Sequence, residues 1–407
     1  MHVLLIHQVF VRGNQVGGTR HYEMARYLVE KGHQVTIITS QTNYLTGELN
    51  QSQEQRGLWA TFWDSGIQIR EVRNYGGYQR SFLHRILSFV SFVVISLPAG
   101  TWGLKPDVVI GTVPPILQDL SAYLVAKIHR VPLILEVRDL FWDYVLQTNT
   151  VRSKLLINIG KYIENWLYQR ATKVIVNSPG FISYLESSGC NKERISLINN
   201  SVDTEQFTPE AACRSVWVPY DCQDRFIVLY AGSHGMLNDL GLLLEAAQSL
   251  QVYTEICICL LGDGKEKQNL MSRATLAGLE NVVFLHPQPK DAMPAFIASA
   301  DVCVATLQDL PILRTVYPNK VFDYMASGRP VILAIDGEIR KVIEDADAGI
   351  FVTPGDVDEL AKAIIKFYRN RDLIESKGTN GRSYVVNNFN RLDQAKKLEQ
   401  LLLDVVE

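Results

Sequence analysis

The chain has 407 residues, of which 47% are apolar and 20% charged, and its formal net charge is −3. This length exceeds what one hydrophobic core normally fills, so we expect two domains of about 200 residues each. The near-neutral balance argues against nucleic acid as the main partner, because phosphate backbones require concentrated lysine and arginine.

Cysteine usage and the chain start bear on the compartment. The six cysteines are scattered through expected core elements and form no C-x2-C pair, which favours reduced, structural thiols in a cytoplasmic protein. Residues 1–6 have no basic flank and no small-residue cleavage site, so we interpret them as a buried first strand and not as a signal peptide.

The first elements form a strand, a glycine-containing loop, an amphipathic helix and a second strand. The pattern predicts a strand at Val3–His7, a helix at Thr19–Lys31 and a strand at Val35–Thr39. Gly17 and Gly18 lie in the loop, where the absence of Cβ atoms lets a substrate approach the backbone and the helix N-terminus favours an anion. A simple turn is the alternative for this glycine pair.

Two stretches follow that lack a clear pattern. We interpret Asn43–Asp64 as a mobile loop over the acceptor side, with a disordered insertion as the alternative. Phe82–Gly103 is strongly apolar, but its continuous run is too short to span a bilayer and Pro98 is expected to break it. It is either a helix packed inside the domain or an interfacial helix with a basic flank, which would give peripheral membrane contact.

The rest of the first half alternates short apolar strands with helices, as in a parallel sheet that is covered on both faces. Strands are expected at Ile67–Val72, Asp107–Gly111, Pro132–Val137, Lys173–Asn177 and Arg194–Ile198, and helices at Ile116–Arg130, Lys154–Arg170 and Gly180–Ser187.

Charged residues end one of these buried strands, in the run Glu136-Val-Arg138-Asp139. Burying charge is costly unless the charges face a cleft or each other. Arg138 and Asp139 are therefore candidates for substrate contact or acid–base catalysis, and a structural Arg–Asp pair is the alternative.

The second half repeats the opening architecture. Phe226–Ala231 predicts a strand that is followed by the loop Gly232-Ser233-His234-Gly235 and a helix near Asp239–Leu250. Ile256–Leu261 predicts the next strand, which ends at Gly262-Asp263-Gly264. Further strands are expected at Asn281–Leu285, Asp301–Thr306, Val331–Ile335 and Gly349–Val352.

The polar segment Asn199–Pro209 suits a linker between the two copies. We therefore expect an N-terminal Rossmann-like domain at residues 1–200 and a C-terminal Rossmann-like domain at 201–387. The C-terminal helix, 388–407, is expected to pack back on the first domain. Because ligands bind at the carboxyl ends of parallel strands, the two sheets predict one interdomain cleft.

The most informative run is Tyr317–Val331, which places Lys320 and Asp323 on the first turn of a short helix that ends at Ser327-Gly328. Free N–H groups and the dipole at a helix N-terminus attract phosphate. Lys320 adds a positive charge, and Asp323 can accept hydrogen bonds from a ribose diol. These residues predict a site for a nucleotide diphosphate.

This run resembles the nucleotide-sugar signature of the retaining glycosyltransferases of family 4, which have the fold type called GT-B. The resemblance is greatest to the subgroup that builds bacterial surface polysaccharides. In the family's E-x7-E segment, Asp323 stands in place of the second Glu and Thr315 in place of the first. Family members usually have an Arg and a Lys after the first strand of the second domain, and this chain has neither. Phosphate charge would then be met by Lys320, loop amides and His234 or Arg314, and a local loop role is the alternative for His234.

The resemblance implies a GT-B enzyme (EC 2.4 class) with two Rossmann-like doubly wound domains facing a cleft. The N-terminal domain would bind the acceptor, and the C-terminal domain would bind the nucleotide sugar. The enzyme would move a sugar from a nucleotide diphosphate, UDP-linked, to a hydroxyl of a lipid-linked glycan, with retention, in surface polysaccharide biosynthesis. It would act in the cytoplasm, peripherally at the inner face of the membrane. The implied catalytic residues are Lys320, Arg138 and Asp139, and the implied donor-binding residues are Gly17, Gly18, Gly232, Ser233, His234, Gly262, Asp263, Arg314, Asn319, Lys320 and Asp323.

No metal or other cofactor is expected. Asp345-Ala-Asp347 and Asp356-Val-Asp358 have the D-x-D spacing of metal-dependent glycosyltransferases, but we interpret the first as a turn and Asp356 as a helix N-cap.

Three alternatives remain for the function. A sugar-nucleotide epimerase shares the GT-B fold, and a non-catalytic nucleotide-sugar-binding protein would fit the missing Arg–Lys pair. A dinucleotide dehydrogenase would need G-x-G-x-x-G after the first strand, which Gly13 and Gly17-Gly18 do not provide.

Overall fold

The computed structural model describes residues 1–407 except 14, 16, 43–56, 77–81, 149–150 and 152. The described chain divides into two compact units. The N-terminal unit consists of residues 1–13, 17–198 and 395–407, and the C-terminal unit contains residues 199–394.

The N-terminal unit is built on an eight-stranded sheet of order β3-β4-β2-β1-β5-β6-β7-β8. Its strands are β1 (His2–Ile6), β2 (Gln34–Ser40), β3 (Trp59–Asp64), β4 (Ile67–Val72), β5 (Val108–Val113), β6 (Leu133–Val137), β7 (Lys173–Val176) and β8 (Ile195–Leu197). All neighbouring strands are parallel except β3, which runs antiparallel to β4. The short apolar runs of the sequence therefore form a parallel sheet, as predicted.

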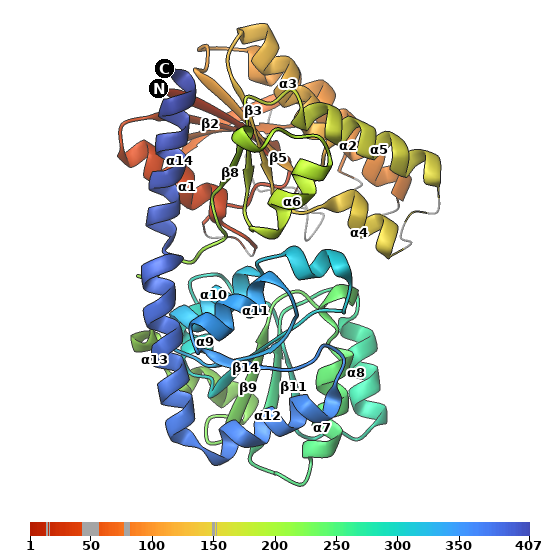
Figure 1. Ribbon diagram of the computed structural model, residues 1–407, viewed down its shortest axis with the longest axis vertical. Helices are drawn as coiled ribbons and strands as arrows, with labels where there is room; N and C mark the ends of the chain where they lie inside the picture. The colour runs from red at the N-terminus through yellow and green to blue at the C-terminus, as the bar shows by residue number, and fades with distance from the viewer. Residues whose placement is uncertain (14, 16, 43–56, 77–81, 149–150, 152) are drawn as a thin grey trace. The chain divides into compact units, whose positions relative to one another are not determined.

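Helices cover both faces of this sheet (Figure 1). They are α1 (Arg20–Glu30), α2 (Phe82–Thr101), α3 (Leu117–His129), α4 (Phe141–Gln147), α5 (Lys154–Tyr168), α6 (Gly180–Ser187) and most of α14 (Arg391–Val406). On one face, α1 and α14 share a core with the strands, in which Leu28 packs with Leu398 and Leu402. On the other face, α2 packs against α3, and α3 packs against α5.

Two predictions for this unit are wrong. Part of the stretch that we interpreted as a loop, Trp59–Asp64, forms the edge strand β3, because its aromatic and β-branched residues pair along β4. Residues 43–56 of that stretch lie outside the described chain. Pro98 does not break the apolar run either, since α2 continues through it to Thr101. A proline near the end of a helix removes only one intrahelical donor, and the Pro98 carbonyl still accepts from the N–H of Trp102.

The C-terminal unit contains a fully parallel six-stranded sheet of order β11-β10-β9-β12-β13-β14. Its strands are β9 (Phe226–Ala231), β10 (Ile256–Leu261), β11 (Val282–Leu285), β12 (Val302–Thr306), β13 (Val331–Ala334) and β14 (Gly349–Phe351). Its helices are α7 (Gly241–Leu250), α8 (Lys267–Leu276), α9 (Met293–Ala298), α10 (Asn319–Ala326), α11 (Glu338–Asp345), α12 (Val357–Arg369) and α13 (Arg371–Asn388). Short 3-10 turns precede β9 and follow β9 and β12: η3 (Arg214–Tyr220), η4 (Met236–Asn238) and η5 (Pro311–Thr315).

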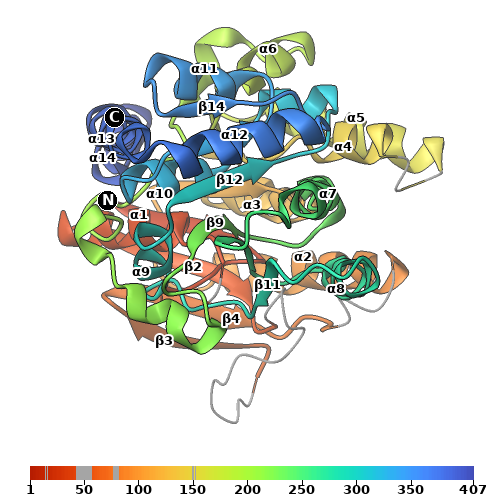
Figure 2. The ribbon, with the colours of Figure 1, turned by 90° about the horizontal axis from the view of Figure 1, so that it is seen from below.

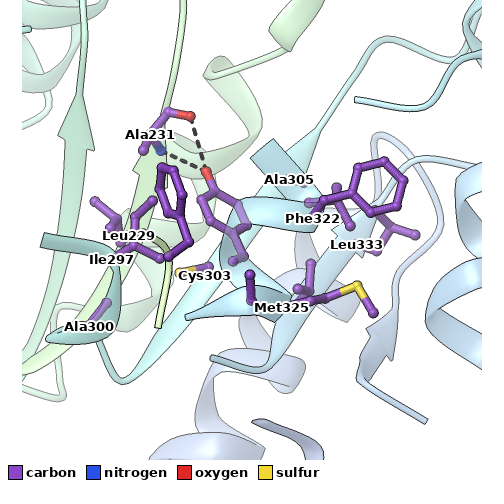
Figure 3. Close-up of a cluster of buried hydrophobic side chains, with 14 of the residues drawn as sticks. Leu229, Ala231, Ile297, Ala300, Cys303, Ala305, Phe322, Met325 and Leu333 are labelled. Carbon is purple, nitrogen blue, oxygen red and sulfur yellow. Dashed lines mark hydrogen bonds between the residues drawn. The ribbon is translucent and has the colours of Figure 1, made fainter. Parts of the chain in front are cut away.

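Each face of this second sheet has its own hydrophobic core. One core contains side chains of α9, α10, α11 and α13, and the other contains side chains of α7, α8 and α12. Figure 2 shows α7 and α8 side by side on one side of the strands. In the first core, Phe322 and Met325 of α10 pack with Cys303 and Leu333 of the strands (Figure 3). The apolar face of α10 is thus fixed, which leaves its N-terminal turn to position the candidate site.

Candidate functional site

The strand order of the C-terminal unit reverses between β9 and β12. From β9 the chain builds outward through β10 and β11, and it then returns to the other side of β9 with β12, β13 and β14. Connections that leave the carboxyl ends of β9 and β12 must turn in opposite directions, which opens a crevice where open α/β sheets bind ligands. The loop of Gly232–Gly235, the loop of Gly262–Gly264 and the start of α10 all follow strand ends of this sheet.

Lys320 lies on the first turn of α10 and reaches the end of β9. Its Nζ donates to the Tyr230 hydroxyl at 2.6 Å and to Oδ1 of Asn238 at 3.2 Å, and it lies 4.0 Å from the centre of the Tyr230 ring. Within the described chain, no carboxylate forms an ion pair with it. Burial lowers the pKa of Lys320 from its ordinary value to about 7. The hydrogen-bond partners of the Lys320 ammonium are thus neutral groups, so an anion that binds here could form an ion pair with it.

The N-terminus of α10 adds to this polarity. Pro318 occupies the N-cap and no side chain caps the first turn. First-turn N–H groups and the helix dipole attract anions under these conditions. The helix is held against β9 by the Tyr324 hydroxyl, which accepts from the N–H of Ala231 at 2.8 Å and donates to its carbonyl at 3.1 Å. Figure 3 shows these two hydrogen bonds beside the packed face of α10.

Two glycines allow the loops of the site to pack against each other. Gly232 has φ +153°, and a Cβ placed on it would lie 3.0 Å from Nζ of Lys320. Gly262 has φ +144°, and its Cβ would lie 1.9 Å from the carbonyl oxygen of Gly232. A larger residue at either position would meet an unfavourable backbone conformation, and at Gly262 it would also clash with the backbone of Gly232. The N–H of His234 donates to the Asp263 carbonyl at 2.8 Å, which joins the two loops.

His234 is fully buried, and neither ring nitrogen has a hydrogen-bond partner in the described chain. Burial, with the nearby charge of Lys267, lowers its pKa to about 4. The imidazole is therefore neutral near pH 7 and supplies no positive charge, although its nitrogens can still take part in neutral hydrogen bonds. Lys267 donates to the carbonyls of Gly262 and Leu285 at 2.7 and 2.8 Å and thus braces the second loop.

The remaining donor-side predictions have different surroundings. Arg314 is half-exposed on η5, and its guanidinium makes a bidentate pair with Asp309 at 2.8 and 3.0 Å, so its charge is already matched. Asn319 is the first residue of α10. Asp323 is its fifth residue and therefore lies on the second turn, not on the first turn as we predicted. The hydroxyl of Thr315, which stands at the position of the first family Glu, donates to the carbonyl of Ile312 at 2.6 Å. Ser233 and Asp263 are exposed beside the two glycines.

In the N-terminal unit, Glu136 anchors a buried polar network. One carboxylate oxygen accepts from Nε of Arg20 at 2.8 Å, and the other accepts from Nε2 of His21. Arg20 also donates to the carbonyl of Ile198 at 2.8 Å. Burial alone would raise the pKa of Glu136, but His21 and Arg20 hold it well below the ordinary value. The strand-end charge is thus neutralised by the first turn of α1.

A second histidine adjoins this network. His7 follows β1, is buried, and has no partner for either ring nitrogen among the described residues. Its ring centre lies 4.5 Å from that of His21, whose Nδ1 is also unpartnered. Burial lowers the pKa of both imidazoles, so both are neutral near pH 7. Unsatisfied buried nitrogens are costly, and these three could form hydrogen bonds with hydroxyl groups.

Arg138 and the predicted glycine pair lie close together. Nη2 of Arg138 lies 3.7 Å from the position of a Cβ on Gly18, and its buried Nε has no partner in the described chain. Gly17 has φ +136°, which favours glycine. Asp139 is exposed, and it makes no ion pair with Arg138 in the described part of the chain. The structural Arg–Asp pair that we considered for these residues is therefore not formed.

Sequence analysis missed His7, Arg20 and His21 as site residues. Arg20 and His21 directly follow Gly17-Gly18-Thr19. Their position at the start of a helix, just after a glycine turn, was the signal that could have identified them. Their partner Glu136 is more than 100 positions away, and no local pattern links them.

Among the described residues, one group has the composition and proximity to hold a metal ion: Cys222, Cys257 and Cys259, whose sulfurs lie within 4.8 Å of one another. Cys257 and Cys259 lie on β10 and Cys222 precedes β9, so the group is in the apolar core and not at the loops after the strands. The D-x-D residues have other roles. Asp356 caps α12 by accepting from the N–H of Glu359 at 2.8 Å, and Asp347 pairs with Lys377 at 2.6 Å.

Comparison with known protein families gives two matches. Residues 17–206 match the family model described as Glycosyltransferase Family 4, and residues 225–370 match the one described as Glycosyl transferases group 1. The two matches together span most of both units.

Individual proteins are similar over nearly the whole chain. WcaI of Escherichia coli (strain K12), named as a colanic acid biosynthesis glycosyl transferase, is 24% identical over 402 residues, which is 94% of each chain. The crystal structure of Anabaena HepE in complex with UDP-glucose has a TM-score of 0.73 at 18% identity and covers 99% of this chain and 100% of its own. Sucrose-phosphate synthase from Thermosynechococcus elongatus has a TM-score of 0.77 at 17% identity, with 99% and 98% covered. These structural neighbours confirm the predicted GT-B fold.

Proposed function

This chain belongs to family 4 of the glycosyltransferases, and from that premise we propose that it transfers a sugar from a UDP-linked donor to a hydroxyl of a lipid-linked glycan. The transfer retains the anomeric configuration and serves the synthesis of a surface polysaccharide on the cytoplasmic side of the membrane. The relative WcaI, whose name refers to colanic acid biosynthesis, supports the last part.

One observation carries the donor assignment. Lys320 presents an ammonium that no carboxylate of the described chain neutralises, on the uncapped first turn of α10, at the point where the strand order reverses. Such a position suits a diphosphate, whose charge would be shared by Lys320 and the N–H groups of the loop and helix. The HepE structures contain UDP and UDP-glucose, which supports uridine as the base.

The mechanism follows from the same charges. As the bond from the sugar to the phosphate breaks, negative charge grows on the leaving diphosphate, and a preformed cation with aligned N–H groups stabilises that charge without reorganisation. Retention fits an attack from the same face as the departing group, in which a phosphate oxygen takes the proton of the acceptor hydroxyl. Lys320 is therefore the main catalytic residue, and Asp323 and Asn319 hold the ribose and the diphosphate. No metal ion is needed in this scheme, because Lys320 and the amides supply the positive charge.

We assign the acceptor to the N-terminal unit. Gly17 and Gly18 leave room for a sugar next to Arg138, and Asp139 is exposed after the same strand. The unpartnered nitrogens of His7 and His21 suit hydroxyl groups, which can both donate and accept.

A screen of nucleotide sugars tests the proposal. A donor at about 100 times its Kd should stabilise the protein by roughly 2.7 kcal/mol, which is readily seen as a rise in melting temperature. The stabilising donors are then incubated with membrane extracts that contain lipid-linked glycans, and the products are followed by mass spectrometry and by the anomeric coupling in NMR spectra.

Glycan extension with an unchanged anomeric configuration is the expected result. Consumption of the UDP-sugar without any acceptor would instead identify an epimerase. Tight nucleotide binding without turnover on any acceptor would identify a binding protein, and inverted products would overturn the mechanism.

A further inference from the structure

Helix α2 has an apolar stripe that faces solvent. Leu83, Leu87, Val90 and Val94 follow one another at helical spacing, and each is between 47% and 70% exposed. Exposed apolar residues are common singly, but four on one face of a helix form a continuous patch. The helix also contains no acidic residue.

The opposite face of α2 is fixed to the sheet. Phe92 and Ala99 are fully buried, the Ser96 hydroxyl donates to the Ser121 hydroxyl of α3 at 2.9 Å, and Arg70 of β4 donates to the Ala99 carbonyl at 2.6 Å. By length and composition alone, Leu83–Thr101 would be apolar enough to cross a membrane. A helix that forms part of the layer covering a sheet cannot do so without unfolding the domain, so only its outer stripe is available.

The patch extends over the neighbouring helices. On α3, Leu124 and Ile128 are exposed one turn apart. On α5, exposed apolar and aromatic side chains recur at helical spacing, and they are Leu155, Leu156, Ile159 and Tyr162. Because α2 packs on α3 and α3 packs on α5, these residues belong to one outer face, which we call the α2–α3–α5 face.

The fully exposed charges of these three helices have one sign, and the half-buried Lys161 of α5 is paired with Asp143 of α4 at 2.8 Å. The only carboxylates in the sequences of the three helices are Asp119 and Glu164, and both are fully buried. The exposed charges are cationic, and Lys127, Arg130, Lys154 and Arg170 lie on or directly after α3 and α5. Two of them border aromatic rings, since Lys127 lies 5.9 Å from the ring of Tyr123 and Arg170 lies 4.1 Å from that of Trp166.

We propose that the α2–α3–α5 face is a docking surface for a bilayer that contains acidic phospholipid. Apolar side chains flanked by lysine, arginine and aromatic rings, without exposed acids, match the boundary between acyl chains and anionic headgroups. A second copy of the chain fits less well, because a symmetric contact would place the cations of one face near those of the other.

The orientation of the helices gives the docking a direction. The N-terminal ends of α2 and α5 lie toward the carboxyl edge of the parallel sheet, since each helix returns the chain to the start of the next strand. Leu83, Leu87 and Leu155 are therefore on the same edge as His7 and Gly18. This proximity to the acceptor side rests on the proposed function, but the docking surface itself does not.

Vesicle flotation with the full chain tests the proposal. The protein should bind phosphatidylcholine vesicles that contain phosphatidylglycerol, should bind pure phosphatidylcholine more weakly, and should be released as salt is raised. The double variant Leu83→Gln/Leu87→Gln should bind the acidic vesicles at least about tenfold more weakly, because the contact loses two leucines that the bilayer would bury. Leu276→Gln, at an exposed leucine of the C-terminal unit, is the matched control and should bind as wild type.

Several outcomes would overturn the proposal. These are failure of the wild type to float with acidic vesicles, equal binding of the double variant, and a concentration-dependent dimer that the same two substitutions abolish. Thermal stabilisation by UDP-glucose is measured in parallel on every variant. It should be unchanged in Leu83→Gln/Leu87→Gln, so a loss of docking is distinguishable from a failure of the donor assignment.

Discussion

Both units gather charged and polar side chains at the carboxyl edge of a parallel sheet, but they treat positive charge differently. In the N-terminal unit, the guanidinium of Arg20 is matched by the buried carboxylate of Glu136, which also accepts a hydrogen bond from the neutral imidazole of His21. In the C-terminal unit, Lys320 is held by a phenol and an amide, and no acid of the described chain pairs with it. The first arrangement is complete without a ligand, whereas the second gains an ionic partner only when an anion binds.

This difference suits the two sites to different ligands. In the proposed function, the neutralised network offers neutral nitrogens to hydroxyl groups of the acceptor, while the unmatched ammonium binds the diphosphate of the donor. The same fold element, a helix that starts after a strand, thus supports two kinds of recognition, and the distinction depends on whether a carboxylate is present.

The largest effect is expected for Glu136→Ala. The substitution leaves the guanidinium of Arg20 buried without its carboxylate, and breaking a buried pair in this way costs about 3–5 kcal/mol. Urea denaturation followed by circular dichroism measures the loss. Glu344→Ala, which breaks the half-exposed pair with Arg340, is the control and should cost about 1 kcal/mol or less. If the two variants were equally stable, the network around Glu136 would not support the N-terminal unit.

Lys320→Ala tests the other side of the comparison. The fold should persist, because Lys320 makes no buried ion pair, but kcat/KM should fall by about 10²–10³-fold as the leaving diphosphate loses its cation. Lys362→Ala, at an exposed position of α12, should leave the kinetics unchanged. Wild-type turnover by Lys320→Ala would refute the donor site.

Tyr324→Phe removes the hydroxyl that holds α10 to β9. The N–H of Ala231 then loses its partner, and an unsatisfied buried donor costs about 1–3 kcal/mol. We expect reduced stability in a thermal melt together with weaker UDP-glucose binding, since α10 carries Lys320. Weaker binding without any loss of stability would instead indicate that the hydroxyl contacts the ligand directly.

The smallest effect is a pH dependence of donor binding. In the free protein Lys320 has a pKa of about 7, and a bound diphosphate favours the ammonium and raises that value. Below pH 7 the group is protonated in both states and binding is strongest. Above pH 7 binding must take up a proton, so the affinity should fall by up to about tenfold per pH unit.

Calorimetric titration with UDP-glucose, whose phosphates do not titrate near neutral pH, measures this slope in buffers of different ionisation enthalpy. The slope should disappear in Lys320→Ala. A slope of the opposite sign would show that a different group controls binding.

Local patterns predicted most of the fold. The apolar runs located the parallel strands of both sheets with each bound within two residues, and the run around Lys320 predicted α10 together with its end at Ser327. These elements depend on periodicity and on glycine and proline positions, which are visible over a few residues.

What the sequence could not reveal depends on contacts between distant residues. Trp59–Asp64 became a strand only because β4 offers a free edge, and α2 tolerates Pro98 because the missing N–H donor falls in its last turn. Arg20, which pairs with Glu136, is more than 100 positions away from it in the sequence. The exposed side of α2 depends on which of its residues pack against the sheet, and this cannot be read from the helix alone. The placement of Lys320 between neutral groups was equally invisible, because Tyr230 and Asn238 are far from it in sequence.

The path of α14 has a consequence for how the polypeptide is made. Ala395, Leu398 and Leu402 belong to the core of the N-terminal unit, and Glu399 accepts hydrogen bonds from Tyr27 and His33. These residues are translated after residues 199–394, which form the C-terminal unit. Until α14 has been translated, α1 and one side of the first sheet lack its apolar residues, so the N-terminal unit of the nascent chain exposes apolar surface to chaperones or to aggregation.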